Sequence, residues 1–210
     1  MNSKPKKIDP SENEKAMCSF RTIFKSSDTF SNPFKSVIEE KIILYNELYR
    51  LDEDHYHALG NSALDIYDSS AAYISLVEDF MNDDYSHKQF WIIDLLSYPY
   101  EDLINQHDGW IPIAENAIFP SYGKWGIVFS KYGHSILGGS RSFISSLRNQ
   151  IPSLNDQVYD FLAEVRNEIN QNTDTQKYFK KWLPQLLSSI YGEDQSMKMQ
   201  KRVGLELPPF

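Results

Sequence analysis

Carboxylates and histidines crowd one short segment of the chain, Asp52–His57, which reads DEDHYH. These are the side chains that bind metal ions, but two histidines at positions i and i+2 cannot share one helical face. No HExxH motif or matched pair of CxxC motifs accompanies them. We therefore expect no metal and no cofactor here, and interpret the segment as a solvated helix start.

A second acidic group follows at the expected end of the same helix. Acidic side chains at a helix C-terminus cost about 0.3–1 kcal/mol each, because the helix dipole already places negative charge there. Hydration alone can compensate such carboxylates, and so can a cationic partner. We predict a partner-binding surface from both groups, with Tyr56 or Tyr85 as an aromatic anchor; its acidic members are Asp52, Glu53, Asp54, Glu78, Asp79, Asp83 and Asp84.

A glycine-rich turn before a helix resembles an anion-binding site. Backbone N–H groups at a helix start, two hydroxyls and one guanidinium could hold a phosphate at Gly139, Ser140, Arg141 and Ser142. The turn lacks the spacing of the P-loop and of the dinucleotide fingerprint. A strand-to-helix turn with a capping serine explains the same residues equally well.

No nucleophile motif is present, and we predict no catalytic residue. Gly133-His134-Ser135 lacks the second glycine of a nucleophile elbow, and Cys18 has no histidine near it in sequence. The leading interpretation is a non-enzymatic binding module. The alternative is a hydrolase or transferase whose site is assembled from sequence-distant residues, which a deep pocket with convergent histidine and carboxylate groups would favour.

Charge is distributed unevenly along the chain. Ser36–Trp110 holds sixteen Asp or Glu residues and only three Lys or Arg, whereas the whole chain has 29 and 21. Such a surface attracts cations and repels nucleic acid, so we expect a basic protein partner and no nucleic acid. The start of the chain has no apolar signal stretch and no run is long enough to span a membrane, which predicts a cytoplasmic protein without membrane contact.

Helical periodicity dominates the front of the chain. Apolar residues recur every three or four positions from residue 33 to about 49, from about Asp54 to Phe80, and from Ser86 to about Ser97. We predict a helix for each. Residues 1–16 read as a flexible tail, and residues 17–35 as a strand or an extended arm.

The pattern changes to short β-type runs separated by Pro and Gly over residues 110–139. This segment predicts a small antiparallel sheet, with a hairpin at Lys131–His134 in which Gly133 has a positive φ. Ser140 should then cap a helix over Arg141–Gln150.

Helices complete the chain to Gly192. One carries a stripe from Leu154 to Ile169 with Ser153 as its cap, and the last is interrupted at Pro184. The predicted fold class is α+β and mostly helical. Residues 17–210 form one domain, with an acidic helical front part (33–107), the small sheet (110–139) and a helical end (140–192).

The sheet segment also resembles a known group of proteins. Trp110-Ile111-Pro112-Ile113-Ala114-Glu115-Asn116, Trp125–Ser130 and Leu137–Ser140 are similar to segments of small α+β immunity proteins of bacterial polymorphic-toxin and contact-dependent inhibition systems. The resemblance covers about thirty residues. It implies a protein that binds and neutralises a cognate toxin domain, often a basic nuclease, and it assigns no individual functional residue.

Overall fold

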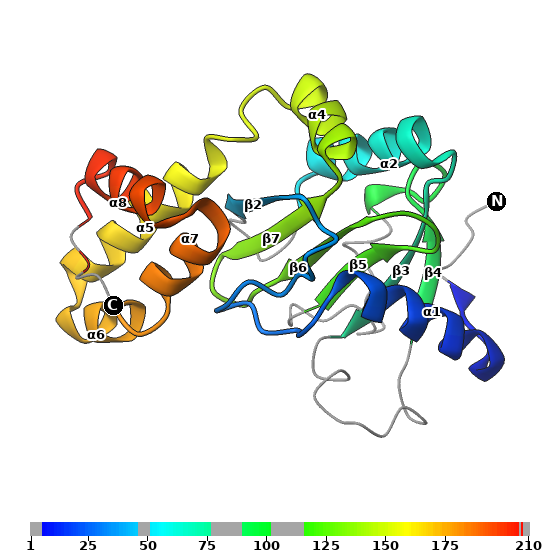
Figure 1. The fold of residues 1–210 in the computed structure, drawn as a ribbon, viewed down its shortest axis with the longest axis horizontal. Helices are drawn as coiled ribbons and strands as arrows, with labels where there is room; N and C mark the ends of the chain where they lie inside the picture. Colours follow the sequence, from blue (N-terminus) through cyan, green and yellow to red (C-terminus); the bar gives the residue numbers. More distant parts are fainter. Residues whose placement is uncertain (1–5, 46–50, 77–89, 102–115, 206, 208–210) are drawn as a thin grey trace.

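A seven-stranded antiparallel sheet forms the centre of the molecule (Figure 1). The computed structural model describes residues 6–45, 51–76, 90–101, 116–205 and 207. The strand order is β1-β4-β3-β5-β6-β7-β2. The strands are β1 (Lys6–Lys7), β2 (Glu40–Tyr45), β3 (Ala71–Leu76), β4 (Phe90–Asp94), β5 (Asn116–Pro120), β6 (Trp125–Phe129) and β7 (His134–Gly139).

Helices cover both faces of this sheet, which gives a three-layer arrangement. Apolar side chains of α2 and α4 pack on one face, and those of α1, α5 and α7 pack on the other. The C-terminal helices gather at the β2 end of the sheet (Figure 1). The helices are α1 (Pro10–Ile23), α2 (Glu53–Tyr67), α4 (Arg141–Gln150), α5 (Gln157–Gln171), α6 (Thr173–Phe179), α7 (Leu183–Tyr191) and α8 (Glu193–Arg202).

The predicted fold class was wrong in its proportions. The protein is α+β but not mostly helical, and its sheet extends far beyond residues 110–139, because β2, β3 and β4 come from the front part expected to be helical. These strands are buried on both faces: Ile43 packs in one layer and Ile42 and Leu44 in the other. Strands of this kind lack the apolar–polar alternation that distinguishes a strand from a helix.

The long helix predicted over residues 54–80 ends early. Asp68 adopts a left-handed conformation with φ of 55° and terminates α2, and β3 begins three residues later. At the N-terminus, α1 begins at Pro10, inside the predicted tail, and covers residues 17–23 of the predicted arm. Its start has a recognisable signal, since Asp9 caps the helix by accepting the Ser11 N–H at 2.9 Å and Pro10 occupies the first turn.

The edge strand β2 is closed by the C-terminal helices. It pairs with β7 on one side, and on the other the Ile43 N–H donates to the Tyr191 hydroxyl at 2.8 Å. A side-chain partner of this kind occupies a backbone group that would otherwise be available to another strand. The same contact places α7 against the charged residues at the start of β2.

Candidate functional site

The outward face of α2 is acidic at both ends and carries an exposed leucine in its last turn. Asp52 caps the helix, since its carboxylate accepts the His55 backbone N–H at 2.8 Å. The opposite side of the helix is buried in the core. We call the exposed set the α2 face; it consists of Asp52, Glu53, Asp54, His57, Asn61, Leu64, Asp65 and Asp68.

The α2 face carries no Lys or Arg, because residues 51–76 contain neither. Asp52 and Glu53 side chains are 65% and 62% exposed. Near the N-terminus their charges are favoured by the helix dipole, and a stabilising role explains them. Asp65 lies near the C-terminus, where the dipole disfavours an acid, so helix stability does not explain its presence.

The predicted aromatic anchor Tyr56 is not part of this surface. Tyr56 is fully buried, its hydroxyl donates to the Tyr98 carbonyl at 3.1 Å, and burial raises its pKa. The exposed apolar residues here are Leu64 and Ile66 of α2, at 43% and 36%, and Leu96, at 37%. Leu96 packs against α2 one turn before Leu64, since a Cβ on Gly60 would be 2.9 Å from Leu96 Cδ2.

The remaining predicted contact residues of the acidic surface lie outside the described residues. These are Glu78, Asp79, Asp83, Asp84 and Tyr85. The described part of the predicted surface is therefore the start of α2, and the structure adds Leu64, Asp65, Asp68 and Leu96 to it. Sequence periodicity predicted that Leu64 and Asp65 lie in a helix. Leu96 comes to this face only because β4, the strand just before it, runs antiparallel to β3.

His55 forms a close pair with the capping aspartate. Its Nδ1 lies 2.6 Å from Asp52 Oδ1, and its buried Nε2 has no hydrogen-bond partner within the part of the chain that the structure describes. The carboxylate therefore fixes a ring orientation in which Nδ1–H donates. General-base sites also contain histidine–carboxylate pairs. The enzyme alternative, however, expects a site assembled from sequence-distant residues, whereas His55 and Asp52 lie within one helical turn.

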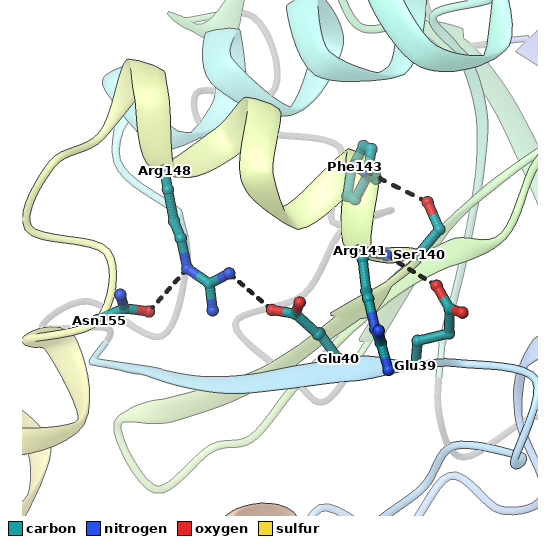
Figure 2. Close-up of polar contacts among 7 residues, drawn as sticks. All are labelled: Glu39, Glu40, Ser140, Arg141, Phe143, Arg148 and Asn155. Atoms are coloured by element: carbon teal, nitrogen blue, oxygen red, sulfur yellow. Dashed lines mark hydrogen bonds and ion pairs between the residues drawn. The ribbon is translucent and has the colours of Figure 1, made fainter.

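The predicted anion-binding turn is occupied by a carboxylate of the protein itself (Figure 2). Glu39 Oε2 accepts the Arg141 backbone N–H at 2.9 Å. Ser140 caps α4 by accepting the Phe143 N–H at 3.3 Å, and its hydroxyl also contacts Tyr67 and Ser142 at 2.8 and 3.1 Å. Gly139 leaves room for the Phe143 ring, since a Cβ there would lie 2.6 Å from it. The turn binds negative charge, and Glu39 supplies that charge.

A second contact joins the start of β2 to α4 (Figure 2). Arg148 Nη1 lies 2.6 Å from Glu40 Oε2, and Arg148 Nε donates to Asn155 Oδ1 at 3.1 Å. Sequence reasoning missed this contact because Glu40 and Arg148 are 108 positions apart and no local pattern links them. Together Glu39 and Glu40 anchor both ends of α4 on the edge strand.

Within the described ranges, no three His, Cys, Asp or Glu side chains are placed so that they could hold a metal ion. None of the described helices combines the length and the hydropathy needed to cross a bilayer.

Comparison with known proteins gave no match. No family model matches the chain, and no curated protein or solved structure is significantly similar to it.

Proposed function

We propose that the protein is a binding module that docks a basic protein partner on its α2 face. The observation that carries the proposal is the α2 face itself: an exposed helix side with acids at both ends, no Lys or Arg, and the exposed Leu64 one turn beyond the point where Leu96 packs against the helix. Protein interfaces commonly combine a small apolar centre with a charged rim. Here the rim carries one sign of charge, which selects a partner of the opposite sign.

The acidic rim would act mainly on the rate of association. Complementary charge steers two proteins together and loses its effect as salt screens it. The apolar pair would act on the lifetime of the complex, since burial of Leu64 and Leu96 gains about 25 cal/mol per Å² of apolar area removed from water. The proposal therefore assigns different kinetic roles to Asp65 and to Leu64.

The class of partner follows from the sequence resemblance. Immunity proteins of the group that residues 110–140 resemble bind toxin domains, many of which are basic nucleases. We propose that this chain likewise neutralises a basic toxin domain and acts in the cytoplasm.

The experiment is affinity capture from the native cell lysate with three tagged proteins at low salt. The first is the wild type, and the second is the double variant Asp54→Lys/Asp65→Lys. The substitutions sit at opposite ends of α2, so their effects on the helix dipole oppose each other and the fold should be retained. The control is Asp160→Lys/Glu164→Lys, which reverses two exposed acids on α5.

The proposal expects a basic protein captured by the wild type and by the control but not by the α2 variant. Inhibition of that protein's toxic activity by the wild type would then support the immunity role. Equal capture by all three proteins would refute docking on the α2 face. Capture of a partner without inhibition would leave a binding module and reject the toxin assignment.

A further inference from the structure

A polar crevice of about 510 Å³ lies beside the outer edge of β2, between that strand and helices α5, α7 and α8. Its volume falls in the range of small-ligand sites, roughly 300–1,000 Å³. We call it the β2 crevice. Its lining includes Lys41, Arg148, Asp156, Tyr159, Tyr191 and Arg202.

Hydrogen-bond donors from three helices, α4, α7 and α8, line the β2 crevice. The Tyr191 hydroxyl accepts the Ile43 N–H, which leaves its own proton available to donate. Arg148 uses Nη1 and Nε on Glu40 and Asn155, and its Nη2 has no described partner. The Arg202 guanidinium stacks 3.9 Å over the Tyr159 ring, which orients it without neutralising it.

The charge balance of the crevice favours an anion. Of its acids, Glu39 is held by the α4 N-terminus and Glu40 by Arg148, which leaves Asp156. Of its cations, Lys41 donates to the Ile38 carbonyl at 2.9 Å and Arg202 contacts a ring, so within the described residues neither has a carboxylate partner. Burial, and then the charge of Lys25, lowers the pKa of Lys41, which is the behaviour of a cation whose charge is not compensated.

We infer that the β2 crevice binds the phosphate group of a small soluble ligand, with Arg148, Arg202 and the Tyr191 hydroxyl as its donors. Guanidinium groups match phosphate oxygens in geometry as well as charge. A phosphate seated there would receive hydrogen bonds from α4, α7 and α8 at once. The site is separate from the α2 face, so either can fail without the other.

The test is an NMR titration with inorganic phosphate and with glycerol phosphate, at constant ionic strength against chloride. Two signals report on the site directly: the Ile43 amide, which donates to Tyr191, and the Arg148 Nε–H. The variant is Arg202→Gln. The matched control is Lys201→Gln, which removes the same charge from the next residue of α8 but lines the neighbouring groove between α7 and α8.

We expect saturable shifts at both reporters in the wild type and in the control. Arg202→Gln should weaken binding about tenfold, because a charge-assisted bond to phosphate is lost. Tyr191→Phe is a second variant and should also weaken binding. The inference is overturned if phosphate shifts neither reporter, if Lys201→Gln weakens binding as much as Arg202→Gln, or if only phosphatidic acid vesicles bind.

Discussion

Stability at mildly acidic pH should depend on one buried histidine, His134 at the start of β7. Its Nε2 donates to the Thr29 carbonyl at 3.0 Å, and its ring lies between Phe161 and Trp182 at centroid distances of 4.9 and 5.4 Å. Burial lowers the pKa of His134 from 6.5 to about 4, against the opposing effect of hydrogen bonds to the Thr29 and Tyr132 backbone. The neutral ring therefore joins the sheet to the C-terminal helices.

The sign and size of the effect follow from that pKa. Because the folded protein binds the proton less readily than the unfolded chain, the stabilisation is fully present above pH 6.5 and is lost as the pH falls toward about 4. The full difference corresponds to about 3 kcal/mol, and about 2 kcal/mol should already be lost near pH 5. That is a large part of the 5–15 kcal/mol by which domains are typically stable.

The assay is urea unfolding, followed by tryptophan fluorescence, near pH 7.5 and near pH 5. His134→Gln keeps a donor for Thr29 and cannot titrate in this range, so its free energy of unfolding should fall by about 2 kcal/mol less than that of the wild type between the two pH values. His57→Gln, on the exposed side of α2, should retain the wild-type fall. Equal falls in the wild type and His134→Gln would refute the argument.

Two further substitutions test the packing and capping described above. Gly138→Ala should lower the free energy of unfolding by about 1–3 kcal/mol in the same assay, because its Cβ would lie 2.7 Å from Ile38 and 2.9 Å from Phe34. An unchanged free energy of unfolding would mean that Ile38 and Phe34 can move to make room. Ser140→Ala should lower the free energy of unfolding by about 1 kcal/mol, because it removes the α4 cap and the contact with Tyr67. Ser140→Thr should retain most of that stability, and equal losses in the two variants would contradict the capping role.

The second half of the chain was largely predictable because its signals are local. Helix α4 spans Arg141–Gln150 with Ser140 as its cap, and Gly133 has a φ of 73° at the turn of the β6–β7 hairpin, as predicted. A break near Pro184 is also confirmed, since α6 ends at Phe179 and α7 begins at Leu183 with the proline in its first turn. The cap of α5 was wrong: Asp156 rather than Ser153 precedes the helix. Helix α8 was missed.

The front half failed because tertiary burial decides its structure. Apolar spacing alone cannot separate a helix from a strand that is buried on both faces, as β2 and β3 are. The break after α2 depends on Asp68 adopting a left-handed conformation. Aspartate tolerates this conformation, but the apolar periodicity of the sequence gives no sign of it. The acidic start of α2 was identified from sequence, whereas burial of Tyr56 and the approach of Leu96 depend on the path of β4.

The predicted anion-binding turn shows which contacts can be predicted from a local sequence pattern and which cannot. The helix start at Ser140 and Arg141 does attract a negative group, as its chemistry requires. That group is Glu39, which directly precedes β2, the strand that pairs with β7. No spacing rule connects residues about a hundred positions apart, so neither this contact nor the β2 crevice could be read from the chain.

The most direct measurement of the central claim is the association rate constant for the captured partner, purified and measured against ionic strength. The wild-type rate should fall steeply with salt, and Asp54→Lys/Asp65→Lys should slow association by about tenfold or more at low salt and flatten the salt dependence. Leu64→Ala should instead raise the dissociation rate with little effect on association. Salt-dependent association that is the same for the wild type and the α2 variant would place the interface elsewhere on the molecule.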